Sequence, residues 1–195
     1  MLLLSLNHQS LIATKANRIY LSCKGRAFSD FGARRAHNGD AAIYGARASY
    51  IGGASSTATT LAAKKFDIKV SGTMAHSWVM SFDSEYEAFK AYAEIYPNNA
   101  VLLIDTYDVL NQGVRNAIKV ANEFLIPHGY RLKGVRIDSG DLAYLSKECR
   151  KILDEAGLND CQIVVSNSLD EFKIKSLIEQ GAKIDLFGVG ENLIT

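Results

Sequence analysis

His76 lies in the stretch SGTMAHSWVM, which runs from residue 71 to residue 80 directly after a short apolar run. A histidine packed in a core needs no glycine and threonine ahead of it. A histidine that must meet a phosphate or a substrate does, because glycine lets the backbone approach a ligand closely. The stretch therefore indicates that His76, with Thr73 near it, takes part in chemistry.

Polar residues or glycines also follow four further apolar runs. They are Asp105, Thr106 and Asp108 after the second run, Arg136, Asp138, Ser139 and Asp141 after the third, Ser166 and Asn167 after the fourth, and Gly188 and Gly190 after the fifth. In parallel α/β folds the working residues gather where the strands end. The set as a whole predicts a catalytic face, although single members could simply cap the next helix.

The residue types suggest what such a face binds. Gly188 and Gly190 permit close backbone approach, which suits a phosphate. Arg136 ends an apolar strand, so its guanidinium is expected to point into the site and to clamp a planar anion. The aspartates could hold Mg²⁺, with Asp105 and Asp108 as the candidate ligands, or ribose hydroxyls.

The elements that must position these residues follow from the apolar pattern. Runs that are apolar on both faces predict parallel strands at 68–72, 100–105, 132–138, 162–167 and 183–190. Helical patterns lie between them, at 83–97, 111–129, 141–157 and 169–181, and the alternation indicates repeated βαβ units. We therefore expect one partial α/β domain over 1–195, with a mainly helical lead-in at 1–67 and βα repeats at 68–195. A closed barrel needs about eight strands, so the chain is expected to be a piece of a larger enzyme.

Bulk composition narrows the class of protein. The net charge is +1, from 22 basic and 21 acidic residues, with no basic stripe, which argues against nucleic acid or a membrane surface as partner. Three cysteines without paired spacing argue against a disulfide framework or a zinc site and favour the cytoplasm. His8, His37 and His128 are expected to be ordinary polar residues.

Six stretches together resemble nicotinate phosphoribosyltransferases. In chain order they are SLIATKANRI, DFGARRAHNGDAAIYGARASYIGGASS, SGTMAHSWVMSF, AVLLIDTYDVLNQG, GVRIDSGDLAYLSKECRKILDEAG and DLFGVG. Few other families combine FG-x-R-R, GT-x-AHSW and R-x-DSGD. The resemblance covers nearly the whole chain, and it implies a partial (β/α) barrel of the type II phosphoribosyltransferase kind, with parallel strands and crossover helices, preceded by helices.

The resemblance also implies a reaction. Nicotinate attacks C1 of 5-phosphoribosyl 1-pyrophosphate and displaces pyrophosphate, which gives nicotinate mononucleotide in the first step of NAD salvage from nicotinate. Coupled ATP hydrolysis proceeds through a phosphorylated histidine, and Mg²⁺ is the cofactor. Enzymes of this type work as homodimers.

Roles for single residues follow from their places in the motifs. The implied catalytic residues are His76 as the phosphorylated histidine, Asp138 on the ribose hydroxyls, and Arg136. The implied substrate-binding residues, at the pyridine and the phosphates, are Arg34, Thr73, Ser55, Thr106, Ser166, Asn167, Gly188 and Gly190. Ser55 stands where the related nicotinamide enzymes have an aspartate. A hydroxyl can donate to the carboxylate of nicotinate, whereas a carboxylate would repel it, so Ser55 favours the acid over the amide.

Two alternatives stay open. The chain could belong to a nicotinamide or quinolinate phosphoribosyltransferase, or it could be a non-catalytic fragment that only binds a partner or a phosphate ligand. Relative to the family, 1–195 lacks the N-terminal domain and the C-terminal region. We therefore expect this chain alone to be poorly active and marginally stable, with apolar edges left open.

Overall fold

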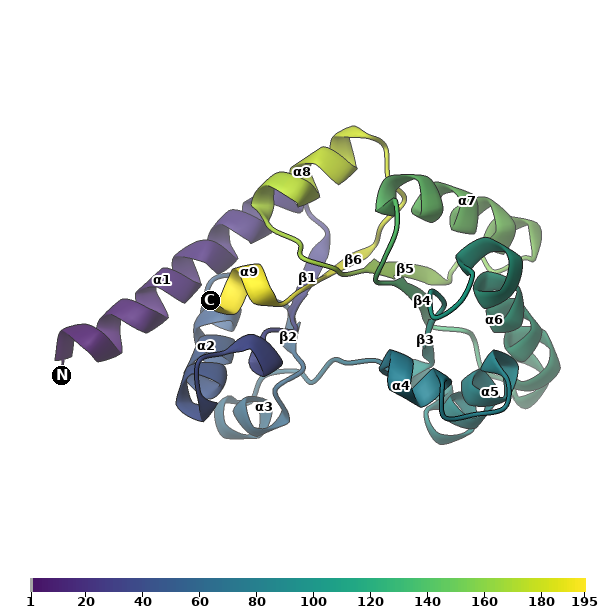
Figure 1. Ribbon diagram of the computed structural model, residues 1–195, viewed down its shortest axis with the longest axis horizontal. Coiled ribbons are helices and arrows are strands. Elements are labelled where there is room, and N and C mark those ends of the chain that lie inside the picture. Colours follow the sequence, from purple (N-terminus) through teal and green to yellow (C-terminus); the bar gives the residue numbers. More distant parts are fainter. Residues whose placement is uncertain (1) are drawn as a thin grey trace. The chain divides into compact units, whose positions relative to one another are not determined.

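The computed structural model describes residues 2–195, which form two compact units (Figure 1). The first unit consists of the residues up to Gly72 together with Ser166–Gln180 and Asp185–Thr195. The second unit consists of Thr73–Val165 and Gly181–Ile184. Each unit contains three parallel strands and its own helices.

The first unit packs helices against strands β1, β2 and β6. Its elements are α1 (Leu2–Ser22), β1 (Ala27–Asp30), η1 (Ala33–Arg35), α2 (Gly39–Ile51), β2 (Ser56–Thr57), α3 (Thr60–Phe66), α8 (Glu171–Glu179), β6 (Leu186–Val189) and α9 (Glu191–Ile194). β1 pairs in parallel with both neighbours, so that Ser29 lies opposite Ser56 on one side and Gly188 on the other. α1 packs along α2 and α8.

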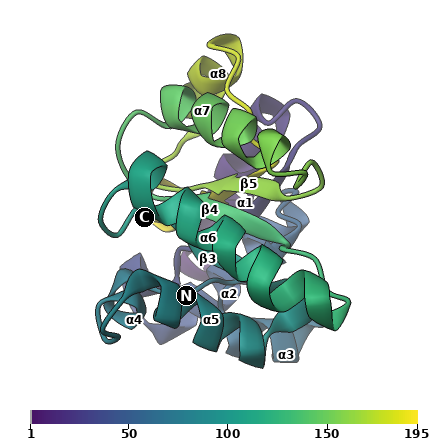
Figure 2. The ribbon, with the colours of Figure 1, turned by 90° about the vertical axis from the view of Figure 1, so that its right-hand side faces the viewer.

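The second unit is built in the same manner around β3, β4 and β5. Its elements are α4 (His76–Val79), α5 (Glu85–Ile95), η2 (Pro97–Asn99), β3 (Val101–Leu103), the π-helical η3 (Val109–Gly113), α6 (Val114–Val120), the π-helical η4 (Ala121–Leu125), η5 (Ile126–His128), β4 (Gly134–Ile137), α7 (Leu142–Glu155) and β5 (Gln162–Val165). β4 is the central strand, with Val135 opposite Leu102 and Ile163. α5 packs against α6, and α7 packs against β4 and β5 (Figure 2).

Capping residues lie close to the helix ends that the sequence predicted at 83–97, 141–157 and 169–181. Ser84 caps α5, and its hydroxyl accepts the N–H of Glu87 at 3.2 Å. Gly157 and Gly181 follow α7 and α8, each with a φ of +74°, a conformation that glycine adopts without strain. The predicted ends of these helices are therefore confirmed.

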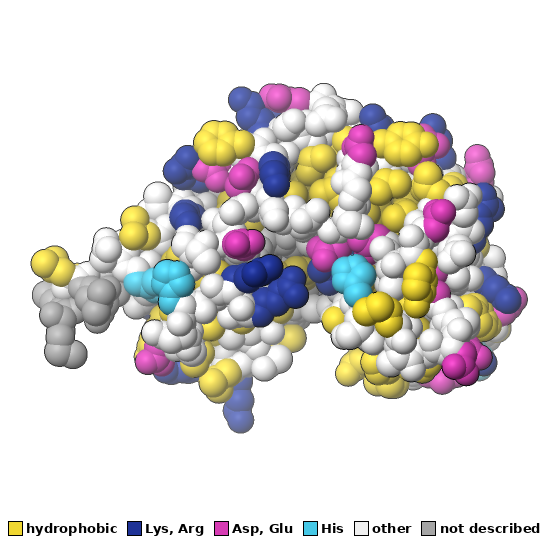
Figure 3. Space-filling view, viewed as in Figure 1, with side chains coloured by type: hydrophobic (Ala, Val, Ile, Leu, Met, Phe, Trp, Pro, Cys, Tyr) yellow, Lys and Arg dark blue, Asp and Glu magenta, His cyan; other side chains and the backbone are white. Residues whose placement is uncertain are grey.

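Large apolar side chains fill both units, and the cysteines are buried with them. Phe28 and Phe187 are fully buried in the first unit. Burial raises the pKa of Cys23, in the first unit, and of Cys149, in the second, to about 12 in each case. On the face that Figure 3 shows, basic and acidic side chains lie interspersed. Among residues 2–195, no helix combines the length and the apolar character that crossing a membrane requires.

The lead-in differs from the sequence prediction in two ways. The predicted strand at 68–72 is wrong, because only Val70 forms an isolated bridge, to Thr57, and its side chain is exposed. The lead-in predicted to be mainly helical at 1–67 also contains β1 and β2, and β2 separates α2 from α3. Gly53 follows the C-cap residue of α2 and has a φ of +116°. The four strands predicted after residue 100 are confirmed as β3, β4, β5 and β6.

Candidate active site

His76 and Asp105 form a close pair in the second unit. His76 begins α4, and Asp105 follows β3. The Nε2 atom of His76 lies 3.2 Å from Oδ1 of Asp105, whose side chain is fully buried while that of His76 is 39% exposed. A carboxylate only accepts hydrogen bonds, so the neutral imidazole places its hydrogen on Nε2 and its lone pair on Nδ1. The pair therefore fixes the tautomer of a partly exposed histidine.

The second oxygen of Asp105 fastens the loop after β4. Oδ2 accepts the N–H of Asp138 at 2.9 Å and the hydroxyl of Ser139 at 2.6 Å. With His76 on the other oxygen, three donors surround one buried carboxylate. This arrangement holds the ends of β3 and β4 together, since a buried charge needs such partners.

Arg136 joins the same network from β4. One terminal nitrogen of its guanidinium donates to the hydroxyl of Thr73 at 2.8 Å, and the other lies 3.1 Å from Oδ1 of Asp138. The side chains of Arg136 and Asp138 are largely buried, at 14% and 19% exposed. Thr73, His76, Asp105, Arg136 and Asp138 are thus one connected set, which we call the charge network.

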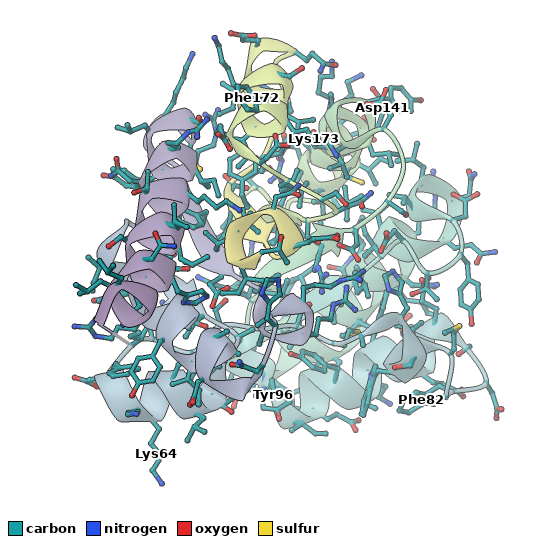
Figure 4. The ribbon with its side chains drawn as sticks, turned by 60° about the vertical axis from the view of Figure 1, so that its left-hand side comes forward. Lys64, Phe82, Tyr96, Asp141, Phe172 and Lys173 are labelled. Atoms are coloured by element: carbon teal, nitrogen blue, oxygen red, sulfur yellow. The ribbon has the colours of Figure 1, made fainter. Side chains whose placement is uncertain are left out.

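The remaining polar residues of the second unit have other surroundings. Asp108 is exposed and caps η3, accepting the N–H groups of Leu110 and Asn111, and its pKa is lowered chiefly by the hydrogen bond from the Asn111 side chain. Asp141 caps α7 through the N–H of Tyr144 (Figure 4). The hydroxyl of Thr106 is buried and has no hydrogen-bond partner among the described residues.

These surroundings bear on the candidate Mg²⁺ ligands. Both oxygens of Asp105 already accept protein donors, and Asp108 is occupied by the start of η3. Within residues 2–195, no cluster of three or more His, Cys, Asp or Glu side chains could hold a metal ion. The arrangement therefore gives no support to an ion held jointly by Asp105 and Asp108.

The predicted phosphate-binding residues come together in the first unit. Ser166 and Asn167 follow β5, while Gly188 and Gly190 lie on β6 and directly after it. A Cβ added to Gly188 would come within 2.5 Å of the Phe31 ring and 3.3 Å of the Cβ of Ser166. The two loops are therefore direct neighbours, and only glycine fits between them. Their role as phosphate ligands stays a prediction.

Arg34 and Ser55 also lie in the first unit. Arg34 is exposed on the short helix η1. The hydroxyl of Ser55 donates to the carbonyl of Phe28 in β1 at 2.9 Å. Its hydrogen is therefore directed at the strand, and in this arrangement Ser55 does not offer the donor that the resemblance implied for a pyridine carboxylate.

Sequence reasoning missed Asp30, at the end of β1. Its side chain is buried and accepts the N–H of Gly32 at 2.8 Å and the hydroxyl of Thr57 at 2.7 Å. Burial raises the pKa of this carboxyl, and the two hydrogen bonds oppose that rise. Asp30 thereby ties the start of the loop that carries Arg34 to β2. An aspartate directly before a Phe-Gly pair was the available signal.

Glu85 was also missed, because the sequence placed it only near the start of the helix predicted at 83–97. Its side chain is buried, and Oε2 accepts the side-chain amide of Asn116 at 2.9 Å. Oε1 has no partner among the described residues. Burial raises the pKa of Glu85, the Asn116 hydrogen bond opposes the rise, and the negative charges of Asp105 and Asp108 add to it.

Solved structures define the class of this fold. Human nicotinic acid phosphoribosyltransferase matches with a TM-score of 0.85 and 30% identity, over 94% of this chain and 47% of its own. Nicotinate-nucleotide pyrophosphorylase from Pyrococcus furiosus matches with a TM-score of 0.80 and 30% identity, over 96% of this chain and 47% of its own. The fold is α/β, a partial (β/α) barrel of the type II phosphoribosyltransferase kind, as the sequence predicted.

Sequence comparison identifies the family. The model of the nicotinate phosphoribosyltransferase (NAPRTase) family matches residues 26–195, and the chain belongs to that family. Nicotinate phosphoribosyltransferase of Bacillus subtilis is 53% identical over 191 residues, which are 97% of this chain and 38% of the relative. Nicotinate phosphoribosyltransferase pncB2 of Mycobacterium tuberculosis is 47% identical over 186 residues, 95% of this chain and 39% of the relative. The chain thus spans about two fifths of the length of these curated relatives.

Proposed function

We propose that this chain forms part of a nicotinate phosphoribosyltransferase, which joins nicotinate to C1 of 5-phosphoribosyl 1-pyrophosphate and releases pyrophosphate. The product, nicotinate mononucleotide, would enter NAD salvage. The observation that carries the proposal is the charge network, because it unites the R-x-DSGD and GT-x-AHSW motifs of the family in one hydrogen-bonded set. Free thiols in the core are in keeping with a cytoplasmic enzyme.

The charge network suits a reaction in which charge must be stabilised. As pyrophosphate leaves, C1 of the ribose becomes oxocarbenium-like and the leaving group gains negative charge. Nicotinate is already an anion, so a cation that orients it serves better than a general base. Arg136 is such a cation, and Thr73 with Asp138 fixes its guanidinium in advance. Asp138 would also accept ribose hydroxyls, and a role for Arg34 at the pyridine rests on the family resemblance.

His76 would couple ATP to this reaction. Because Asp105 holds Nε2–H, the Nδ1 lone pair attacks the γ-phosphorus of ATP, the bond to the bridging oxygen breaks, and ADP leaves. The phosphoryl group then resides on Nδ1 while Nε2–H keeps its bond to Asp105. Mg²⁺ as cofactor and a homodimer as the working assembly belong to the same proposal and rest on the family resemblance.

The test follows nicotinate mononucleotide formation from nicotinate, phosphoribosyl pyrophosphate and Mg-ATP, with nicotinamide and quinolinate in parallel. We expect product from nicotinate alone, and a fall of about 100-fold in kcat/KM for Arg136→Gln. Arg131→Gln is the matched control, since Arg131 is an exposed arginine of the same unit paired with Asp160, and should change nothing. Equal rates with nicotinamide or quinolinate would contradict the proposed substrate.

Slow turnover of this chain alone stays a prediction, so calorimetric binding of nicotinate is measured beside the rates. The wild-type chain should bind nicotinate, and Arg136→Gln should weaken that binding while Arg131→Gln does not. If the wild type neither binds nicotinate nor forms product, this chain does not carry the activity by itself, and a non-catalytic fragment would be the better account.

A further inference from the structure

Two consecutive residues in the loop after β5 have positive φ angles. Asn167 has a φ of 99° and Ser168 a φ of 48°, and neither is a glycine. Such conformations cost free energy for residues with a side chain, and they persist only where their surroundings hold them. The loop that contains the predicted phosphate ligands Ser166 and Asn167 is therefore strained and needs an anchor.

Asn192 on α9 supplies that anchor. Its side-chain nitrogen donates to the carbonyl oxygen of Ser168 at 3.0 Å and to that of Leu169 at 3.3 Å. A side-chain amide carries two N–H groups, so one asparagine can serve both carbonyls. Asn192 lies two residues after Gly190, and its contacts therefore tie the loop after β6 to the strained loop after β5.

We propose that Asn192 is a positioning residue for the 5-phosphate of the ribose substrate. It holds the 167–168 turn in its strained conformation beside Gly188 and Gly190, so that both loops present their backbone N–H groups to one phosphate. This inference rests on the proposed function, which assigns the two loops to the phosphate. Asn192 is not among the site residues that the resemblance implied. Its role is to set the geometry of the loop without contacting the ligand.

The hydrogen bonds from Asn192 to the carbonyl oxygens of Ser168 and Leu169, which we call the clamp, can be tested by substitution. Asn192→Ala removes both donors, and the turn relaxes toward negative φ at Ser168. Ser168→Gly removes the cost of the positive φ itself, because glycine has no Cβ. The two changes should therefore interact, since the clamp matters less once the conformation that it enforces carries less strain.

The experiment measures calorimetric binding of ribose 5-phosphate to the wild type, Asn192→Ala, Ser168→Gly and the double variant, well below the Tm of each. We expect Asn192→Ala to weaken binding about tenfold, and the same change in the Ser168→Gly background to weaken it about threefold. Asn17→Ala, on the exposed side of α1 in the same unit, is the matched control and should leave binding unchanged. Each Tm is measured in parallel, since a merely structural role would lower the Tm of Asn192→Ala and leave its affinity intact.

The outcomes separate the two levels of inference. If the wild type binds ribose 5-phosphate and Asn192→Ala binds it equally well, the clamp is overturned and the phosphate assignment stands. If the effects of the two substitutions simply add, the link through loop strain is overturned. If the wild type does not bind ribose 5-phosphate at all, the phosphate role of both loops fails, and the positioning role of Asn192 fails with it.

Discussion

The predicted site residues are held in place by different kinds of contact in the two units. In the second unit, charged side chains hold one another, with the buried carboxylate of Asp105 at the centre. In the first unit, the backbone dominates: glycines lie against Phe31, two residues have positive φ, and one amide clamps them. The charge network should lose stability when one of its charges is removed. The closely packed segments at 166–169 and 188–190, which we call the cradle, should lose stability when a side chain is enlarged. The contrast therefore predicts which kind of substitution damages each unit.

Removal of the central charge should have the largest effect. Asp105→Ala leaves the donors of His76, Asp138 and Ser139 without their common acceptor, and the free energy of unfolding should fall by about 3 kcal/mol. Urea unfolding followed by the fluorescence of Trp78, the one tryptophan of the chain, measures this in the same unit. Asp108→Ala is the control, because that aspartate only caps η3, and should cost about 1 kcal/mol. Equal losses would show that the network contributes no more than a helix cap.

Added bulk in the cradle should come second. Gly188→Ala places a Cβ within 2.6 Å of two atoms of the Phe31 ring, and the required shift should cost about 2 kcal/mol. It should also weaken ribose 5-phosphate binding, because the neighbouring loop must move. Gly72→Ala, where an added Cβ meets nothing within 4 Å, serves as the comparison and should be nearly neutral. Thermal unfolding and calorimetry check both; a neutral Gly188→Ala would contradict the close packing.

The smallest effect concerns the buried Glu85 beside the charge network. Its raised pKa means that the folded chain keeps this proton to a higher pH than the unfolded chain does. Stability therefore falls as pH rises from the ordinary glutamate pKa through the raised one. Glu85→Gln cannot ionise, so its stability should not show this dependence on pH. At pH values above the raised pKa, its free energy of unfolding should exceed that of the wild type by an amount on the order of 1 kcal/mol.

Urea unfolding of the wild type and Glu85→Gln between pH 4 and pH 8, roughly the carboxylate range and above, checks this. Asp30 also has a raised pKa and contributes the same sign of slope to both proteins, so the difference between the two curves isolates Glu85. If the free energies of unfolding of the two proteins change in parallel with pH across the whole range, Glu85 does not contribute to the pH dependence.

The sequence predicted the second half of the fold better than the first. β3, β4 and β5 lie within predominantly apolar runs, with Arg136 in β4 and Gln162 at the start of β5 as polar members. Such runs can be recognised as strands without knowing which strands they pair with. β1 ends in Ser29 and Asp30, which look like loop residues until Ser56 and Thr57 satisfy them. Those partners come from β2, which is only two residues long and has no periodicity of its own. The run at 68–72 was misread because its apolar residues are too few to bury both faces.

The site was predictable in its residue types and not in its connections. The motifs marked Asp105 as a site residue and as a candidate Mg²⁺ ligand, and its role toward Mg²⁺ stays a prediction. That its oxygens face Asp138 and Ser139 depends on pairing between β3 and β4, and that one faces His76 depends on where α4 packs. No local pattern specifies either. Asn192 gave no signal at all, because its role depends on the φ angle of Ser168 in a different loop.

The buried cysteines give the two units separate internal reporters. Only a thiolate reacts readily with alkylating reagents, and a raised pKa together with burial suppresses it at Cys23 and Cys149 while the chain is folded. Each thiol becomes reactive when its surroundings open. Cys23 belongs to the first unit and Cys149 to the second, so mass spectrometry of a labelling time course resolves their opening rates individually. Whether the cradle and the charge network unfold as one cooperative body or as two is thereby measurable on the unaltered chain.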